Sequence, residues 1–487
     1  MKIALINPPF LFSSRRESVY SQCLGARYIC SYLKAKGGHQ VVFIDALMLG
    51  FARAQRYANG RLVGLSVPDV VERIPSDTDL IAVSVPFSQL APIAHEIIEQ
   101  ARGKFPRARI VAGGVYPSAQ PALALSSRAD MVVVGEGELP LLQLADGKDP
   151  AGIAGVYLSS CPPRREYPPA DAVENLDDLP FPDDSIPMVE KYFALSPRMH
   201  RAAPTAALVT SRGCPFDCEF CSIHPVCGWK WRARSAQNVL EEVSYLNRRH
   251  GVRRLEIEDD NFTLSPSRAA EILEGIVRLN EKGARLSWAA HNGLRIETLN
   301  DEVIRLMRAS NCTDVALGLE HGDAEMLRIM DKRLDLEKAL DVIRRLLHAR
   351  IPRIAIFLIV GYPGEARERF LNGMKYLRRI RALGGNVRPC VNFAQPYPGT
   401  RLWKRCVEEG LIADRALDNF LLRKDQTSTE YYVQVETRDF DKEEVLRRKQ
   451  AINDCFAPAW RSTLKRRLPG AVVRAVRRTK RWIGGHP

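Results

Sequence analysis

The sequence lacks several features that would place the protein in a membrane or outside the cell. No uninterrupted apolar run approaches the length of a membrane-spanning helix, about 18 to 20 residues. The start, residues 1–9, resembles a short buried strand stopped by two prolines and not a signal peptide. Eight of the 11 cysteines are scattered along the chain, which argues against a disulfide framework. We therefore expect a cytoplasmic protein.

Acidic residues are missing from the basic end of the chain. The sequence has 71 Lys and Arg against 57 Asp and Glu, a net charge of +14. Nine of the basic residues lie in segment 461–487 with no acid among them. Apolar residues are interleaved with them, and a basic amphipathic helix of this kind can bind an anionic membrane surface. A solvated helix or disordered tail is the commoner structure for such a segment. We expect no nucleic-acid partner, and the tail is a candidate for peripheral contact with a membrane.

Three of the cysteines are not scattered. Cys214, Cys218 and Cys221 lie in the run SRGCPFDCEFC, with the spacing C-x3-C-x2-C. A [4Fe–4S] cluster has four irons, so three cysteine ligands leave the last iron open to a ligand that is not protein. An open coordination position usually serves catalysis and not structure. The motif therefore predicts a catalytic iron–sulfur cluster.

The same cysteines also fit a zinc site with His224 or Cys227 as the fourth ligand. Zinc prefers a closed tetrahedron that is often built from two separated ligand pairs, and no second pair follows at the usual distance. A noncatalytic, zinc-stabilised binding protein nevertheless stays open as an alternative.

Residues 1–145 alternate short apolar runs with helical segments. This pattern predicts an α/β domain with a doubly wound parallel sheet, which binds ligands beyond the carboxyl ends of its strands. Glycine and polar residues lie at these strand ends, where backbone can approach a large ligand closely. The candidate ligand contacts are Pro9, Ser84, Gly113, Gly114, Gly135 and Glu136. Ordinary strand-to-helix turns are the commoner explanation when the glycines are considered alone.

The remainder of the chain divides into three further parts. Residues 146–200 are rich in proline and acid and predict a linker. Residues 201–400 contain six strand candidates separated by helical stretches, which suits a partial (β/α)6 barrel of the TIM type. The three clustered cysteines follow the first of these strands directly. Residues 401–487 predict a small helical C-terminal region that ends in the basic tail.

The C-x3-C-x2-C motif, with Phe220 before its last cysteine, resembles that of the radical S-adenosylmethionine (SAM) enzymes. The resemblance implies that the open iron binds the amino and carboxylate groups of SAM, whose cleavage yields a 5'-deoxyadenosyl radical. Residues at the ends of the barrel strands are similar to the family's SAM contacts, among them the segment Gly318–Gly322 with its glutamate. The implied SAM contacts are Phe220, Glu258, Asp259, Arg295, Glu320 and Gly361.

The N-terminal part is similar to the cobalamin-binding domain that precedes many radical SAM domains. The matching pieces are LGARY at 24–28, GHQVVFID at 38–45, AGGVYP at 112–117 and VGEGE at 134–138. The resemblance implies that cobalamin binds at the strand ends named above. The motif D-x-H-x-x-G, by which other cobalamin proteins supply a histidine to cobalt, is absent. We therefore expect that no histidine holds the lower face of the cofactor.

Together these resemblances, which cover residues 1 to about 400, imply a cobalamin-dependent radical SAM methyltransferase. One SAM would be cleaved to give the radical, and a second would supply the methyl group through cobalamin to an unactivated carbon. The acceptor would be a small molecule, a lipid or a tetrapyrrole. The enzymatic alternative keeps the same cofactors but performs oxidative cyclisation or rearrangement. No second cluster motif is visible, so a flavodoxin or ferredoxin is expected to supply electrons.

Overall fold

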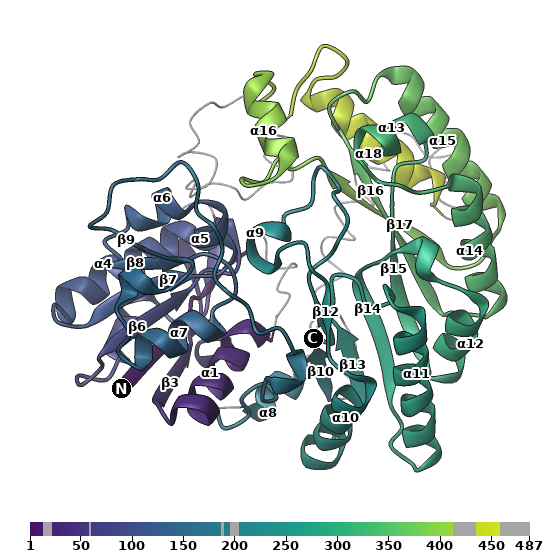
Figure 1. Cartoon of the computed structure of the whole chain (residues 1–487). Coiled ribbons are helices and arrows are strands. Elements are labelled where there is room, and N and C mark those ends of the chain that lie inside the picture. The colour runs from purple at the N-terminus through teal and green to yellow at the C-terminus, as the bar shows by residue number, and fades with distance from the viewer. Residues whose placement is uncertain (13–21, 58–59, 187–188, 195–203, 413–434, 458–487) are drawn as a thin grey trace.

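The computed structural model describes residues 1–12, 22–57, 60–186, 189–194, 204–412 and 435–457. Two α/β bodies lie side by side, an N-terminal one and a larger one that carries the cluster cysteines, and helix α9 (His224–Cys227) lies between them (Figure 1). The basic tail 461–487 lies outside the described residues. No helix in the described ranges is both long enough and apolar enough to span a membrane.

The N-terminal body is built on a six-stranded sheet. Its strands, in spatial order, are β3 (Gln40–Asp45), β1 (Lys2–Asn7), β6 (Leu80–Ser84), β7 (Arg109–Gly113), β8 (Met131–Val133) and β9 (Val156–Leu158). The first five are parallel, and β9 runs antiparallel to β8. Because β1 lies between β3 and β6, the strand order reverses there, which creates a switch point where ligands bind in such sheets.

Helices cover both faces of this sheet because successive strand residues point to opposite sides. Ile3 and Leu5 of β1 pack in one core with helices α1 and α7, whereas Ala4 and Ile6 pack in the other with α3 and α4. The N-terminal helices are α1 (Leu24–Gly37), α2 (Ala46–Leu49), α3 (Val67–Glu72), α4 (Ala91–Lys104), α5 (Val115–Ala119), α6 (Pro121–Leu125) and α7 (Glu138–Ala145). The predicted doubly wound sheet is confirmed.

Four strands of this half were not predicted from the sequence. Strand β9 belongs to the segment 146–200 that we interpreted as a linker, so the sheet extends beyond residue 145. A small antiparallel sheet is formed by β2 (Phe10–Phe12), β5 (Gly60–Val63) and β4 (Ala54–Tyr57). The segment after β9 contains the short helix α8 (Val189–Ala194). The division of the chain at residues 145, 200 and 400 stays a prediction.

The second body is a partial barrel. Its strands follow chain order: β10 (Thr205–Leu208), β13 (Arg254–Ile257), β14 (Ser287–Leu294), β15 (Cys312–Glu320), β16 (Arg353–Val360) and β17 (Val387–Phe393). All neighbouring pairs are parallel. Within the described residues β10 and β17 are the two edges of the sheet, so the barrel is open. The six predicted strands and the partial barrel are confirmed.

Helices cover the outer face of this sheet. They are α10 (Ala236–His250), α11 (Pro266–Glu281), α12 (Asp301–Ala309), α13 (Ala324–Ile329), α14 (Leu336–His348) and α15 (Arg367–Ala382). Helix α10 shows why they form: Ser235 caps its first turn, Gly251 ends it in the left-handed conformation, and Val239, Val243 and Leu246 form its buried stripe. Four 3-10 turns lie at 88–90, 150–152, 176–178 and 296–298.

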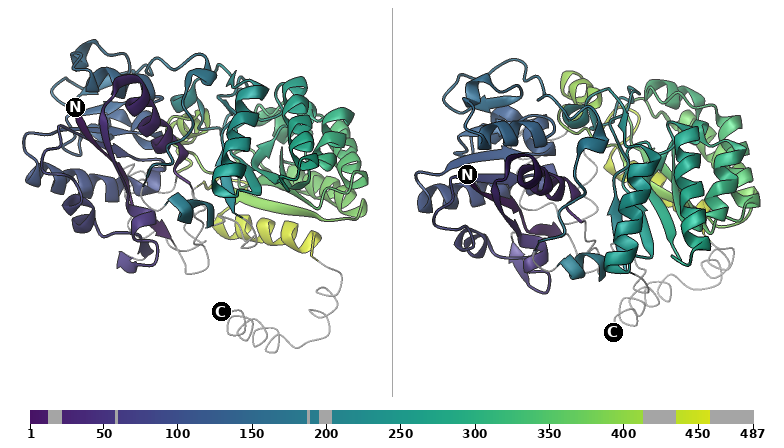
Figure 2. Two further views of the ribbon diagram at one scale, coloured as in Figure 1. Left: turned by 90° about the horizontal axis from the view of Figure 1, so that it is seen from below. Right: turned by 60° about the horizontal axis from the view of Figure 1, so that its bottom comes forward.

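The C-terminal region adds the helices α16 (Arg401–Glu408) and α18 (Lys442–Cys455). Helix α18 packs against β16, β17 and α15, and it lies along the barrel in the view from below (Figure 2). It buries Val445, Arg448 and Ile452. This helix is therefore part of the barrel wall and not an appendage.

Candidate active site

The cluster loop, residues 213–223, leaves the barrel directly after β10 and the two-residue strand β11 (Ser211–Arg212). Strand β11 pairs antiparallel with β12 (Arg232–Ala233), which closes the base of the loop. Gly213 has a φ of +84°, and a Cβ there would lie 2.4 Å from the backbone oxygen of Lys230. Only glycine fits this position, so the backbone next to Cys214 is held tightly.

The thiols of the loop lie in a partly desolvated place that contains basic groups. Burial raises the pKa of Cys221 to about 12. Burial also raises the pKa of Cys218, although the positive charges of Lys332 and Arg295 oppose the shift. Iron binding would displace the thiol protons, as metal binding to cysteine generally does. The positive charges near Cys218 suit the anionic sulfurs of a loaded cluster.

Of the two side chains that could complete a zinc site, His224 has other partners and Cys227 faces a cavity. His224 Nε2 lies 3.1 Å from the backbone oxygen of Cys214, and its ring stacks on Trp229 with centroids 3.6 Å apart. Cys227 lines the cavity between the two bodies. In the described part of the chain, no three His, Cys, Asp or Glu side chains converge to hold a single metal ion.

A cluster with an open iron fits the residues that are present. The loop supplies three thiols, which is the donor set that leaves one iron of a [4Fe–4S] cluster free. Asn261 is 3% exposed, its Nδ2 lies 4.0 Å from Cys214 Sγ, and its Oδ1 has no hydrogen-bond partner. A buried unpaired acceptor beside the loop indicates a place for a donor that a ligand would supply.

Arg295 lies against the cluster loop, as expected for a residue near SAM. Its guanidinium stacks 3.5 Å above the ring of Phe216, and its Nη2 donates to Glu297 Oε1 and to the backbone oxygen of Arg333, both at 3.1 Å. One face of the guanidinium is therefore covered by the loop itself. Its contact with the SAM carboxylate stays a prediction.

Glu320, at the end of β15, is buried and paired. Lys332 Nζ lies 3.3 Å from Glu320 Oε1, and Glu320 adopts a φ of +66°. Burial raises the pKa of Glu320, and the charge of Lys332 opposes that shift. Gly318 leaves room for the pair, because a Cβ there would lie 2.8 Å from Lys332 Nζ. Sequence reasoning missed Lys332, since it lies on the connection after α13 and no strand-end pattern marks it.

The two SAM candidates after β13, Glu258 and Asp259, have different surroundings. Glu258 lines the cavity between the bodies, and its Oε2 accepts a hydrogen bond from Asn292 Nδ2 at 3.0 Å. Asp259 is buried, and it accepts from Thr210 N at 2.6 Å and from the hydroxyls of Thr210 and Ser211 at 2.5 Å. Both oxygens of Asp259 thus hold the chain that leads into the cluster loop, so we assign it to positioning that chain.

The other two SAM candidates pack into the protein. Phe220 lies partly buried against the barrel core. Gly361 has a φ of +73°, donates its N–H to Glu365 Oε2 at 2.7 Å, and leaves room for Val445 of α18. A Cβ at Gly361 would lie 2.9 Å from Val445 Cγ1. The structure therefore gives Gly361 a packing role at the barrel rim, and its contact with adenine stays a prediction.

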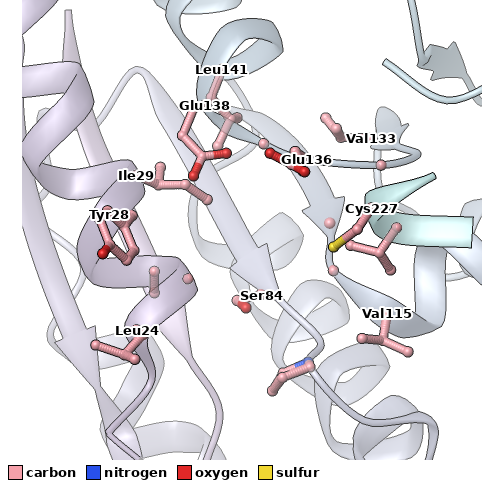
Figure 3. Close-up of a pocket in the computed structure, with 18 of the residues that line it drawn as sticks. Leu24, Tyr28, Ile29, Ser84, Val115, Val133, Glu136, Glu138, Leu141 and Cys227 are labelled. Atoms are coloured by element: carbon pink, nitrogen blue, oxygen red, sulfur yellow. The ribbon is translucent and has the colours of Figure 1, made fainter. Parts of the chain in front are cut away.

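A cavity opens between the strand ends of the N-terminal sheet and the base of the cluster loop. It contains about 1160 Å³ of empty space, part of it open to solvent. Five of the six strand-end residues predicted to contact cobalamin line it: Ser84, Gly113, Gly114, Gly135 and Glu136. Figure 3 labels Ser84 and Glu136 among them. From the barrel side it is lined by Val209, Ser211, Arg212, Val226, Cys227, Glu258 and Asp260. Pro9 does not line it and is buried beside Gly64.

The cavity suits a large cofactor with a flat ring system. Its N-terminal wall combines apolar side chains such as Val111 and Leu141 with glycines at the strand ends. Gly114 has a φ of +110°, and a Cβ there would lie 2.9 Å from the backbone oxygen of Val85. Such glycines let a flat ring system lie close to backbone. The residues therefore fit the corrin ring that a cobalamin-binding domain implies.

Glu136 has a second set of contacts that sequence reasoning did not predict. Its Oε2 lies 2.7 Å from Arg212 Nη1, and its Oε1 is paired with Arg232 Nη2. Arg212 Nη2 also lies 2.8 Å from Glu138 Oε1. The two arginines come from β11 and β12, so these ion pairs join the two bodies. The predicted cobalamin contact of Glu136 would be made by a carboxylate that is already paired.

Comparison with known proteins agrees with this geometry. Residues 20–145 match the family model described as the B12 binding domain, and residues 208–377 match that of the radical SAM superfamily. An uncharacterized methyltransferase of Pyrococcus horikoshii is 28% identical over 425 residues, covering 85% of this chain and 84% of the relative. The cytidylyl-2-hydroxyethylphosphonate methyltransferase of Streptomyces wedmorensis is 26% identical over 461 residues, covering 84% of this chain and 82% of the relative.

The fold also matches solved structures. The radical SAM methyltransferase TsrM of Kitasatospora setae, solved with cobalamin and a [4Fe–4S] cluster bound, superposes with a TM-score of 0.65 at 20% identity. The match covers 85% of this chain and 79% of that one. The pairing of an N-terminal doubly wound sheet with a partial barrel is thus shared with that protein.

Proposed function

Because this chain is a radical SAM enzyme with a B12-binding domain, we propose that it methylates an unactivated carbon of its substrate with the help of cobalamin. The observation that carries this proposal is the cavity between the strand ends of the N-terminal sheet and the base of the cluster loop. A cofactor and an acceptor in that cavity would lie between the N-terminal sheet and the cluster loop, and the proposed reaction needs both of these parts. The methyltransferases among its relatives support the choice of reaction.

The bound groups would supply the difficult chemistry: the cluster gives the electron that cleaves SAM, and cobalamin carries the methyl group. Cys214, Cys218 and Cys221 hold the cluster in this proposal. Arg295 and Glu320 are proposed as SAM contacts because both lie near Cys218 and both are buried and charged. Glu258 is proposed beside them because it lines the cavity at the end of β13.

The protein's own task is to align the reactants and to exclude water. Val209 and Val226 line the cavity near the cluster loop, and the N-terminal wall is mostly apolar. A radical in such a place has few hydrogen donors other than the substrate. Because the bound reactants are held in a fixed orientation, the reaction avoids the entropy cost of bringing free partners together.

The acceptor is proposed to be a small molecule, a lipid or a tetrapyrrole. The same cofactors also suit oxidative cyclisation, and the mass of the product separates the two reactions. Methylation adds one methylene unit to the mass, whereas cyclisation removes or exchanges hydrogen or oxygen.

Anaerobic reconstitution tests the proposal before any acceptor is known. The wild-type chain should turn brown, retain corrinoid after desalting, and convert SAM alone to 5'-deoxyadenosine under a chemical reductant. SAM labelled in its methyl group should leave label in the corrinoid fraction. A chain that retains no corrinoid would overturn methyl transfer through cobalamin and leave the radical assignment intact. A colourless protein that contains zinc would overturn both.

The reductant and the location belong to the same proposal. We propose a flavodoxin or ferredoxin as electron donor, since the enzyme needs low-potential electrons and its motifs provide one cluster. We propose a cytoplasmic protein whose basic tail, residues 461–487, contacts an anionic membrane surface. Unchanged partitioning to anionic liposomes after deletion of 461–487 would remove the membrane contact.

A further inference from the structure

Two arginines of the barrel reach across to the N-terminal domain. Arg212 and Arg232 are opposite each other in the β11–β12 ribbon, and both guanidinium groups meet the carboxylate of Glu136. Arg212 also binds Glu138 through its second Nη nitrogen. We call these four residues, Arg212, Arg232, Glu136 and Glu138, the interdomain clamp.

The interdomain clamp is buried and its charges cancel. The exposed fractions of the side chains are 12% for Arg212, 4% for Arg232, 5% for Glu136 and 4% for Glu138. Two cations and two anions leave no net charge. Pairing of buried ions compensates the loss of their hydration only when the geometry is close to ideal. Such a group therefore specifies one docking arrangement of the two domains more than it adds affinity between them.

Further contacts fix the position of the arginines. The guanidinium of Arg212 lies over the ring of Tyr28 in α1, 5.1 Å from its centroid. Arg232 Nη1 donates to the backbone oxygen of Val173 at 2.5 Å. The clamp thus contacts the first helix, the GEGE turn and the segment that joins the domains.

The clamp is also directly connected to the cluster loop and to the cavity. Arg212 precedes Cys214 by two residues, and Gly213 between them allows no side chain because of the nearby Lys230 backbone. Arg212, Glu136 and Glu138 are all part of the cavity wall, and Figure 3 shows both carboxylates at its upper side. A shift of Arg212 would therefore move the first cluster ligand relative to the cobalamin cavity.

We propose that Arg212 is a positioning residue that registers the cluster loop on the cobalamin-binding domain through Glu136 and Glu138. This inference rests on the proposed function for its catalytic consequence, but the docking itself is a property of the chain without cofactors. Arg212 in this role touches neither SAM nor substrate. It sets the separation between the cluster and the cobalt.

The docking is tested first on the cofactor-free chain by hydrogen exchange. Arg212→Gln should speed amide exchange about tenfold in segments 133–138 and 209–214, because loss of the clamp lets the domains separate locally. Glu136→Gln should produce the same pattern from the other domain. Arg212→Lys should produce a smaller change, because lysine keeps the positive charge but lacks the two Nη nitrogens that bind two carboxylates at once. The matched control is Arg128→Gln, whose partner Glu99 lies in the same domain and whose side chain is 60% exposed.

The catalytic consequence is tested on the reconstituted enzyme. Arg212→Gln should bind wild-type amounts of iron and corrinoid, lower kcat for SAM cleavage about tenfold, and change KM for SAM by less than about twofold. The distribution of dipolar couplings between the reduced cluster and paramagnetic cobalt should become broader, because the distance between them is less well fixed. Arg128→Gln should match wild type in all of these.

Unchanged exchange in both Arg212→Gln and Glu136→Gln would overturn the clamp, whatever the cofactors do. A wild-type coupling spectrum and kcat in Arg212→Gln would overturn its positioning role. If the wild-type chain bound no cluster or corrinoid, the proposed function would fail, while the exchange experiment would still decide the docking. Where Arg212→Gln does not fold, Arg212→Lys and Glu136→Gln answer the same question.

Discussion

The two ends of the barrel strands both carry charged side chains in ion pairs, but the partners of these side chains differ. At the amino-terminal ends, which we call the floor, Arg254, Glu256, Asp314 and Arg353 pair with one another. At the carboxyl ends, the rim, charged residues pair with loops or with the other domain, as Glu320 does with Lys332. The floor residues therefore pair within the barrel sheet, where Glu256 also contacts His291 of β14 at 3.0 Å, whereas the rim residues pair with loops and with the other domain.

The carboxylate of Asp314 in the floor accepts hydrogen bonds from several donors. Its Oδ2 lies 2.6 Å from Arg353 Nη2 and 3.1 Å from Arg254 Nη2, and it accepts from the hydroxyl of Thr313 at 2.7 Å. Burial alone would raise the pKa of Asp314, but the hydrogen bonds from Arg353, Thr313 and Arg254 outweigh it and hold that pKa well below its ordinary value. Among the described residues Glu320 pairs with Lys332 alone, and burial raises the pKa of Glu320.

The largest effect is expected at the rim, from loss of one cluster ligand. Cys218→Ser should abolish SAM cleavage, by roughly 1000-fold or more, because the cluster that supplies the electron is lost. The free energy of unfolding of the cofactor-free chain should change by less than about 1 kcal/mol. Iron analysis measures the cluster content, 5'-deoxyadenosine formation measures SAM cleavage, and urea unfolding measures the stability. Cys390→Ser, at an exposed cysteine, is the control. Full activity in Cys218→Ser would contradict the cluster assignment.

The floor should show the opposite pattern. Asp314→Asn should lower the free energy of unfolding by about 3 kcal/mol at pH 7, because two arginines lose their anionic partner. The pKa of Asp314 is lower in the folded than in the unfolded chain, so its stabilisation is present above pH 4 and is lost as the pH falls. The difference between variant and wild type should therefore shrink below about pH 4. SAM cleavage by the folded variant should be unchanged.

Asp341→Asn is the matched control for the floor, since its carboxylate is 52% exposed in its pairs with Arg344 and Arg345. It should cost less than about 0.5 kcal/mol. A loss at Asp314 that does not vary with pH would show that the stabilisation is not electrostatic.

Packing at the rim is tested by Gly361→Ala. The new methyl group would meet Val445 of α18 at 2.9 Å and would also need a φ of +73°. We expect a loss of roughly 2 kcal/mol, measured by thermal unfolding. Gly384→Ala separates the two causes, because Gly384 has a φ of +75° and nothing within 4 Å of its Cβ position. If both variants lose the same stability, the contact with α18 contributes nothing.

The smallest effect concerns SAM binding. Glu320→Gln should weaken the affinity for SAM about tenfold, because a neutral amide accepts hydrogen bonds from a ribose diol less strongly than a carboxylate. Calorimetric titration with SAM measures it on the reconstituted enzyme. Glu325→Gln, which removes an exposed pair with Arg328, should leave the affinity unchanged. Equal affinity in the two variants would exclude Glu320 from the SAM site.

Sequence reasoning predicted the parts of the molecule that have local signals. The six barrel strands have apolar runs bounded by turn residues, and the cysteine loop has a characteristic spacing, so both could be read from the chain. Strand β9 could not, because it is only three residues long and lies between a glycine-containing turn and a proline-rich segment. Its pairing with β8 depends on tertiary contact and not on local propensity.

The sequence predicted which residues line the candidate site, but it did not predict which side chains bind one another there. The strand-end residues Ser84 and Gly113 do line the cavity, as expected. The sequence gives no sign that Glu136 is bound by Arg212, since 76 residues separate them. The same holds for Asp259, whose acidic context suggested a ligand contact but whose oxygens hold Thr210 and Ser211. Partners that are distant in sequence are the information that only the fold supplies.

Helix α18 has a consequence for how the protein is made. Arg448 lies fully inside the barrel wall, and its Nη1 donates to the backbone oxygen of Glu365 at 2.6 Å. A nascent chain that has not yet released residue 455 from the ribosome lacks this wall. Translation adds only about 5 to 20 residues each second, so the sheet of the first 158 residues can fold many seconds earlier. We therefore expect the cobalamin-binding half to mature first, and the barrel half to close only after α18 has left the ribosome.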